Sequence, residues 1–274
     1  MMDNRPIGVF DSGLGGLTCV KELIQTLPKE GIVYFGDTGR VPYGTRSAQT
    51  IIKYTQSDIN FLSSFDVKLI VAACGTASSV ALDKIQTDIP VIGVLEAVSQ
   101  GAVKKTNTGK IGVLGTSGTI ASGKYIQALK DAGKKLGKED ITVTQQACPL
   151  FVPLVENGYL DHGATYLLAR EYLKPLQEQE VDTVILGCTH YPMLKKVIGD
   201  VMGFHVVLID AGYETAKQVQ RFLQSRKMLC DVRPAEQYRF YVSDETDNFG
   251  QMAGMFLNRD ISGNIEKIDI EQWM

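Results

Sequence analysis

A chain of 274 residues with 44% hydrophobic and 22% charged side chains can bury one large core or two smaller ones. Its formal charge of −3 gives no electrostatic reason to expect a nucleic acid or a membrane surface as partner. Five cysteines at wide, irregular spacings exclude a disulfide framework, and no apolar run is long enough to cross a bilayer, so the sequence predicts a cytoplasmic protein.

The chain begins with a predicted strand, a glycine-rich loop and a helix. Residues 7–10 (IGVF) are apolar, residues 11–16 (DSGLGG) suit a loop, and residues 17–27 have helical spacing. The loop resembles a dinucleotide-binding fingerprint, but its third glycine would fall on Thr18. Because Asp37 follows the next strand, where an NAD-binding acid would lie, an NAD-binding oxidoreductase is one alternative. The glycines would also let backbone N–H groups bind an anion at the helix start.

A cysteine stands at the end of the next apolar strand. Beyond a predicted helix at 47–63, the β-branched run 67–73 ends at Cys74 and is followed by Gly75, Thr76 and a helix start. Such an apolar strand fits a parallel sheet that is covered on both faces. Ligands bind at the carboxyl edge of these sheets, and a helix N-terminus lowers the pKa of a thiol. The alternative is that Cys74 only packs as a small apolar side chain.

The pattern restarts near the middle of the chain. After a strand at 89–94 and a helix at 96–105, residues 111–119 (IGVLGTSGT) echo residues 7–13 (IGVFDSG) at an offset of 104. A second β-branched run ends at Cys188, at an offset of 114 from Cys74. Two landmarks in the same order predict two related α/β halves. If the halves face each other, one cleft has a cysteine on each wall.

The remaining elements complete a prediction of fold class and domains. They are strands at 141–147, 206–210 and 238–243 and helices at 163–179, 193–202, 214–226 and 248–257. The predicted fold is α/β, with two pseudo-symmetric domains, each a mainly parallel sheet flanked by helices, and the active site in the cleft between them. The central domain is placed at 99–209. Residues 210–274 are expected to join 1–98, because a single late strand cannot form a domain alone.

Two opposed thiols suit stereoinversion at the α-carbon of an amino acid. The reaction needs a base on one face and an acid on the other, and a Cys pKa near roughly 8.5 makes both protonation states accessible. Cys74 and Cys188 are the candidates. His190, two residues after Cys188, and Asp11, on the strand expected beside that of Cys74, are the groups expected to manage their protons. The same four side chains are acceptable zinc ligands, so a zinc site is another alternative.

Seven short motifs in order, over about residues 7–257, resemble those of the cofactor-independent glutamate racemases. They are 11–16 (DSGLGG), 36–37 (GD), 42–44 (PYG), 73–78 (ACGTAS), 115–119 (GTSGT), 153–156 (PLVE) and 187–192 (GCTHYP). The resemblance implies two α/β domains with the site between them, glutamate as substrate, no cofactor and no metal. It also implies a homodimer that supplies D-glutamate for peptidoglycan synthesis.

The resemblance also implies roles for individual residues. Cys74 and Cys188 would be the acid/base pair, assisted by Asp11 and His190. The expected substrate-binding residues are Asp11, Ser12, Tyr43, Gly44, Gly75, Thr76, Thr116, Thr119, Thr189 and His190, with the Thr116 loop binding a carboxylate through hydroxyl and N–H groups.

The resemblance leaves two points open. The family's acidic helpers map onto Asp37 and Glu156. The family's usual residue after the first cysteine is Asn, whose amide contacts substrate, whereas this chain has Gly75. Aspartate racemases share the two-cysteine plan, so a racemase of aspartate or a related acidic substrate is an alternative.

Overall fold

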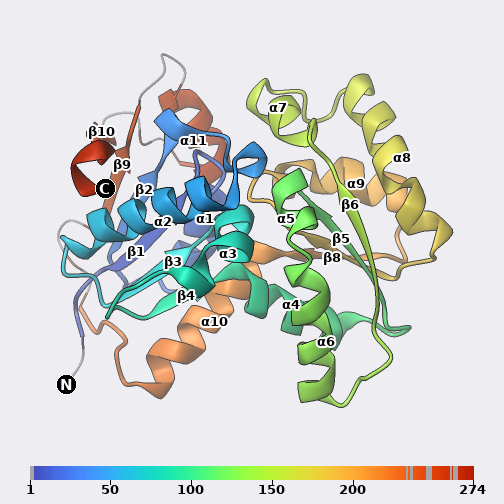
Figure 1. The fold of residues 1–274 in the computed structure, drawn as a ribbon, viewed down its shortest axis with the longest axis horizontal. Coiled ribbons are helices and arrows are strands. Elements are labelled where there is room, and N and C mark those ends of the chain that lie inside the picture. Colours follow the sequence, from blue (N-terminus) through green and yellow to red (C-terminus); the bar gives the residue numbers. More distant parts are fainter. Residues whose placement is uncertain (1–2, 233, 235–236, 245–248, 260, 262–264) are drawn as a thin grey trace.

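The computed structural model describes residues 3–232, 234, 237–244, 249–259, 261 and 265–274 (Figure 1). Its described strands form two parallel sheets, and helices cover the faces of both. The strands of the first sheet nearest its centre are fully buried, as the apolar runs at 7–10 and 67–73 predict. The structure therefore confirms the predicted α/β class with two sheets.

The first sheet has six strands in the order β10-β9-β2-β1-β3-β4. They are β1 (Ile7–Asp11), β2 (Ile32–Gly36), β3 (Leu69–Ala72), β4 (Val91–Gly93), β9 (Tyr238–Val242) and β10 (Ile265–Lys267). The second sheet has the order β6-β5-β7-β8. Its strands are β5 (Lys110–Gly115), β6 (Thr142–Ala147), β7 (Thr183–Leu186) and β8 (Val207–Asp210).

The two sheets contain the same four-stranded unit. The order β2-β1-β3-β4 in the first sheet corresponds to β6-β5-β7-β8 in the second, and all these strands are parallel. Even the register agrees, since Ile7 pairs with Leu69 and Ile111 pairs with Thr183. These partners are related by the offsets of 104 and 114 found in the sequence. The prediction of two related halves is confirmed.

Helices connect the strands and cover both sheets. They are α1 (Leu17–Thr26), α2 (Ala48–Ser63), α3 (Gly75–Val80), α4 (Val94–Lys105), α5 (Ser117–Ala121), α6 (Lys124–Leu136), α7 (Phe151–Glu156), α8 (Gly163–Glu178), α9 (Lys195–Met202), α10 (Ala211–Ser225) and α11 (Phe249–Leu257). The predicted start of the last helix at residue 248 lies outside the described residues. Within the part of the chain that the structure describes, no helix is long and apolar enough to cross a membrane.

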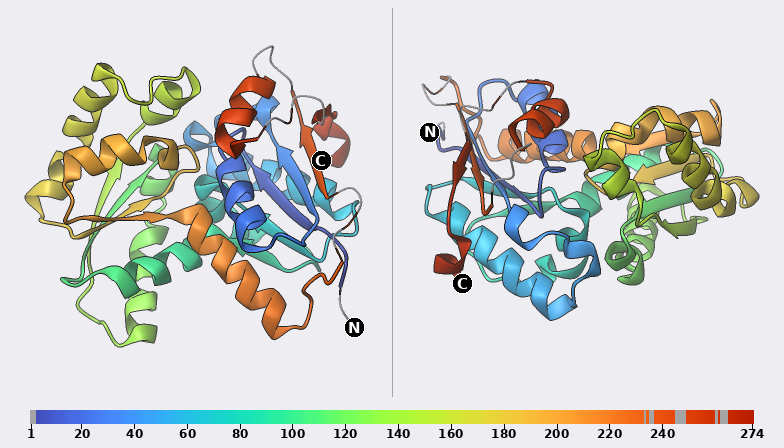
Figure 2. Two further views of the ribbon diagram at one scale, coloured as in Figure 1. Left: turned by 180° about the vertical axis from the view of Figure 1, so that it is seen from behind. Right: turned by 90° about the horizontal axis from the view of Figure 1, so that it is seen from above.

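The two halves are joined through α4 and α10. Figure 2 shows α10 leaving the second sheet and running along the first half, where it packs against α1. The helices approach closely, because a Cβ added at Gly212 would lie 3.0 Å from the Cα of Cys19. Since α4 begins before residue 99 and contacts elements of both halves, the domain limits at 99–209 and 1–98 plus 210–274 stay a prediction.

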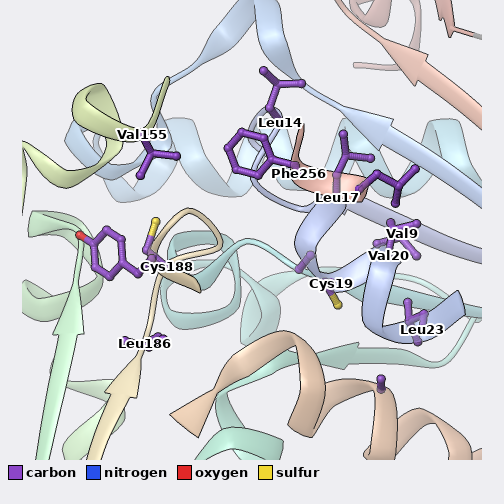
Figure 3. Packing of buried hydrophobic residues seen from close by; sticks show 14 of the residues in the cluster. Val9, Leu14, Leu17, Cys19, Val20, Leu23, Val155, Leu186, Cys188 and Phe256 are labelled. Atoms are coloured by element: carbon purple, nitrogen blue, oxygen red, sulfur yellow. The ribbon is translucent and has the colours of Figure 1, made fainter. Parts of the chain in front are cut away.

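One cluster of buried apolar side chains extends through both halves. Figure 3 shows Phe256 of α11 lying between Leu14 and Leu17 of the first half and Val155 and Cys188 of the second. Phe256 is 1% exposed. A further cluster fills the other face of the first sheet, and another packs α4 and α6 on the second. The shared cluster holds the walls of the site together.

Candidate active site

A cavity of about 340 Å³ lies where the carboxyl edges of the two sheets meet. This is the edge at which parallel α/β sheets bind ligands, and the volume is at the small end of ligand pockets. Cys74 follows β3 and Cys188 follows β7, which are equivalent strands. The residues that line the cavity are Ser12, Val41, Pro42, Tyr43, Gly44, Thr45, Cys74, Gly75, Thr76, Thr116, Ser117, Cys148, Pro149, Val152, Pro153, Glu156, Gly187, Cys188, Thr189 and His190.

Cys74 lies at the N-terminus of α3, as predicted, but its pKa differs from the expectation. Its Sγ accepts a hydrogen bond from the backbone N–H of Ala77 at 3.5 Å and lies 3.6 Å from the Ser12 hydroxyl. Burial raises the pKa of Cys74 to about 12, and the negative charge of Asp11 adds to the effect. The prediction that the helix N-terminus lowers the pKa of this thiol is wrong here, because desolvation of the thiolate outweighs the two hydrogen bonds.

Cys188 is joined to a histidine and a carboxylate. Its Sγ lies 3.9 Å from Nδ1 of His190, whose Nε2 lies 2.9 Å from Oε1 of Glu156. Burial lowers the pKa of His190, but the interactions with Cys188 and Glu156 outweigh it and raise the pKa to about 10. The ring of Phe256 packs edge-on against the imidazole. The site therefore favours a protonated His190 between two acidic groups.

Asp11 lies behind the wall of the cavity and caps its own loop. The carboxylate is 1% exposed, and its Oδ2 accepts hydrogen bonds from the backbone N–H groups of Gly13 and Gly16 at 3.2 and 3.0 Å. Burial raises the pKa of Asp11, while the positive charge of His190 opposes the shift. The glycine loop thus donates two N–H groups to the protein's own carboxylate, and its predicted binding of an external anion stays a prediction. The same two hydrogen bonds occupy N–H groups that the NAD alternative requires for phosphate binding.

The structure joins Asp11 to the opposite wall. Its Oδ1 accepts a hydrogen bond from the Thr189 hydroxyl at 3.4 Å, and Thr18 in the same half donates to the Thr189 carbonyl at 2.9 Å. Among the hydrogen bonds of the described residues, none joins Asp11 to Cys74. The expected pairing of Asp11 with Cys74 is therefore not a direct contact in the structure, although the carboxylate influences the pKa of that thiol.

Three threonine hydroxyls form a cluster across the cleft. Oγ1 of Thr76 lies 2.9 Å from Oγ1 of Thr116 and 3.3 Å from that of Thr119, and the last two are 3.0 Å apart. Thr116 caps α5 through the N–H of Thr119. Thr76 and Thr116 line the cavity, whereas Thr119 is fully buried behind them. The cluster brings hydroxyl groups of both halves to one end of the cavity.

Tyr43 lines the cavity, but its hydroxyl points into a buried polar network. The hydroxyl donates a hydrogen bond to the carboxylate of Asp37 and lies 2.9 Å from Oδ2 of Asp58, and Arg40 binds the same two carboxylates at 2.7 and 2.8 Å. Asp37 and Asp58 are both 0% exposed. The hydroxyl of Tyr43 is therefore occupied by protein partners, and Asp37, one of the predicted helpers, lies outside the cavity lining.

One wall of the cavity is represented among the residues named from the sequence only by the motif 153–156, with Glu156 as a candidate acidic helper. It follows β6 and is formed by Cys148, Pro149, Val152 and Pro153, with Glu156 at its end. Pro149, two residues after β6, and Pro153, in the first turn of α7, would have indicated a strand end followed by a helix start at the carboxyl edge of the sheet. Among the residues that the structure describes, no three His, Cys, Asp or Glu side chains are arranged to hold a metal ion, so the zinc alternative has no cluster to support it.

Comparison with known proteins identifies the family. Residues 7–219 match the family model described as Asp/Glu/Hydantoin racemase. The chain is 43% identical over 269 residues to the glutamate racemase of Geobacter metallireducens, covering 97% of each protein. The crystal structure of a glutamate racemase from Francisella tularensis in complex with D-glutamate has a TM-score of 0.90 at 38% identity, covering 99% of this chain and 100% of that one. A glutamate racemase from Bacillus anthracis also has a TM-score of 0.90, at 37% identity over 97% and 98% of the chains. The chain therefore belongs to the Asp/Glu/Hydantoin racemase family.

Proposed function

We propose that this chain interconverts L- and D-glutamate by proton transfer between two thiols and the substrate α-carbon. The observation that carries the proposal is the placement of Cys74 and Cys188 at equivalent strand ends on facing walls of one cavity. A base on one face and an acid on the other are what inversion requires. Relatives that share about two fifths of the sequence over nearly the whole chain are glutamate racemases, which supports glutamate over aspartate.

The surroundings of the thiols support distinct roles. On one wall, Cys188 exchanges its proton through His190, whose imidazolium is stabilised by Glu156. On the other wall, Cys74 begins as a thiol, because burial disfavours its anion. The resemblance assigns removal of the proton from the D-enantiomer to Cys74 and from the L-enantiomer to Cys188. One cysteine, as the thiolate, removes the α-proton and becomes a thiol, a carbanion-like transition state forms, and the other cysteine, as the thiol, donates a proton to the opposite face and becomes a thiolate.

We further propose that the substrate carboxylates bind at the hydroxyl-rich ends of the cavity. Thr76 and Thr116 form one such end, and Ser12 and Thr189 lie near the thiols. Asp11 and Thr119 act through these residues, since neither lines the cavity. The backbone of Gly44, rather than the hydroxyl of Tyr43, is available to substrate from the 41–45 segment.

Deuterium incorporation tests the two-thiol mechanism. In D₂O, early product should carry deuterium at the α-carbon while unreacted substrate stays protonated, because one thiol removes the proton and the other donates one taken from solvent. A single base acting on both faces would return part of the original proton. Early product that retains the substrate proton would therefore refute the proposal.

Replacement of each thiol provides the second test. Cys74→Ser and Cys188→Ser should each stay folded and lose at least about 10³-fold in kcat, because a serine hydroxyl is a poor acid or base near neutral pH. Cys19→Ser is the matched control, since Cys19 is a buried thiol on α1 outside the cavity. Racemisation by either active-site variant near the wild-type rate would end the two-thiol interpretation.

The biological setting and assembly are proposals from the resemblance. D-glutamate made by this chain would supply peptidoglycan synthesis, and the protein would act as a homodimer. Light scattering after size-exclusion chromatography tests the second point, with a mass near twice 30.0 kDa as the expected result.

A further inference from the structure

The residues beside the two candidate thiols meet across the cleft. Gly75 follows Cys74, and Gly187 precedes Cys188. A Cβ added at Gly75 would lie 2.3 Å from the carbonyl oxygen of Gly187 and 3.4 Å from its carbonyl carbon. Real Cβ atoms essentially never approach another heavy atom within 3.0 Å. The two backbones therefore touch at a place where no side chain fits.

Gly187 cannot move back to make room. Its N–H donates a hydrogen bond to the carbonyl of Leu114 on β5 at 2.8 Å. A Cβ at Gly187 would itself lie 2.5 Å from that oxygen, so the peptide is pressed against the neighbouring strand. Retreat would break the parallel sheet of the second half.

Gly75 is fixed on the other side. Its carbonyl accepts a hydrogen bond from the Ser79 hydroxyl at 2.7 Å, and Ala73, two residues earlier, donates its N–H to Phe10 on β1 at 2.9 Å. Both partners in the contact are thus held by their own halves. A side chain at position 75 would have to be relieved by separating the halves, not by a local shift.

We propose that the Gly75–Gly187 contact is the spacer that sets the distance between the two thiols. The inference rests on the proposed two-thiol function. Each glycine is one residue from a cysteine, so any separation at this contact is passed directly to the gap between Cys74 and Cys188. Proton transfer at both faces of one carbon requires that gap to fit the substrate closely, and a misplacement of about 1 Å costs about 10²-fold in rate.

Two further contacts close the same cleft and would open with it. A Cβ at Gly44 would lie 2.8 Å from Cβ of Thr116, and one at Gly15 would lie 2.3 Å from the Thr189 hydroxyl. These contacts join the same two halves. The close contact at Gly75 is therefore one of three close contacts that hold the two walls of the cleft together.

The proposed spacer gives a physical consequence to Gly75, the residue at which this chain departs from the glutamate racemases it resembles. Those racemases have Asn after the first cysteine, and a simple view would be that Gly75 loses one substrate contact. On the proposal, restoring Asn in this chain drives the walls apart. Gly75→Asn should therefore lower kcat/KM for glutamate. If Gly75 merely lacked a substrate contact, the same substitution would raise kcat/KM.

The test uses Gly75→Ala, Gly75→Asn and the control Gly199→Ala. Gly199 lies in α9, and its added Cβ would meet only Leu208 at 3.7 Å, an ordinary contact. Both Gly75 variants should lower kcat/KM for glutamate, Gly75→Asn by about 10²-fold. Both variants should still fold, because Gly75 begins a helix without positive φ and the clash is relieved by opening the cleft rather than by unfolding either half.

The alkylation rate of the two thiols is the readout that a merely structural role would not change. Cys74 and Cys188 are 5% and 8% exposed, so iodoacetamide should label both faster in the Gly75 variants and no faster in Gly199→Ala, as measured on the cysteine peptides by mass spectrometry. Wild-type activity in Gly75→Asn, or lost activity with unchanged labelling, would overturn the spacer. If the wild-type protein fails to racemise glutamate, the proposed function fails, and the labelling rates alone still decide the spacer.

Discussion

At the scale of single residues, the two candidate thiols have unequal partners. Cys188 has His190 and Glu156 in line behind it, whereas Cys74 has the Ser12 hydroxyl and one backbone N–H. A buried imidazolium stabilises a thiolate far more than a hydroxyl does. The two thiols are therefore expected to respond differently when one of these partners is removed.

We expect His190→Asn to lower kcat unequally in the two directions. The substitution removes the proton partner of Cys188 and leaves the surroundings of Cys74 intact, so the direction that starts with Cys188 as base should lose more, by about 10²-fold or more. Circular dichroism of each enantiomer under saturating substrate measures both values. His205→Asn, at a position outside the cavity, is the control, and equal losses of kcat from D- and L-glutamate would contradict the assignment.

At the scale of elements, the short segment from Thr38 to Thr45 depends on a buried charge network. Asp37, Arg40, Tyr43 and Asp58 are held together by ion pairs and hydrogen bonds, and α2 provides Asp58. Burial, and then the charge of Asp37, raises the pKa of Asp58 well above its usual range. Two buried carboxylates share one guanidinium, so the network is sensitive to the loss of either acid.

Asp58→Ala should destabilise the protein by about 3 kcal/mol, because it removes a buried partner of both Arg40 and Tyr43. It should also raise KM for glutamate, since the segment carries Gly44 at the cavity. Asp58→Asn keeps an acceptor oxygen and should cost less in both measurements. Asp83→Ala breaks an exposed pair with Lys124 and is expected to change neither thermal unfolding nor KM appreciably.

The sequence predicted elements best where apolar strands were short and bounded by sharp changes of composition. The strands predicted at 141–147 and 206–210 agree to within one residue at each end, and the strand ends at Cys74 and Cys188 place the site. The helix Lys124–Leu136 lay outside the predictions, although Tyr125, Leu129 and Ala132 follow helical spacing. The strand Ile265–Lys267 is short and mostly exposed, which leaves little pattern to detect.

The site residues were predicted by type and strand position, but not by the direction in which each side chain points. Asp11 turns toward its own loop because Gly13 and Gly16 offer two N–H groups there. Tyr43 turns toward Asp58, a residue 15 positions away that no local pattern connects to it. The first choice depends on the exact path of a loop and the second on a contact between separate segments, and both decide which predicted residues line the cavity.

At the scale of the whole molecule, the shared apolar cluster couples the two halves. Phe256 packs against His190 of the second half while it belongs to a cluster with β1 and α1 of the first. A core that is continuous between two halves makes their unfolding one cooperative event.

We therefore expect a single unfolding transition. Far-UV circular dichroism and the fluorescence of Trp273, the one tryptophan, should change at the same temperature, although Trp273 packs against Phe61 in the first half. Phe256→Ala should lower the stability of the whole molecule by about 3–5 kcal/mol and keep the two signals coincident. Separate transitions would show that the halves unfold independently.

Equilibrium limits the effect that the unequal partners of the two thiols can have on the two directions of the reaction. Enantiomers have the same free energy in water, so the equilibrium constant between L- and D-glutamate is unity, and kcat/KM must be the same in both directions for the wild-type protein and for every variant. The His190–Glu156 pair on one wall alone cannot favour one product. The asymmetry of the site can appear only as a difference in kcat that is matched by an equal proportional difference in KM. The direction with the higher kcat therefore also has the higher KM.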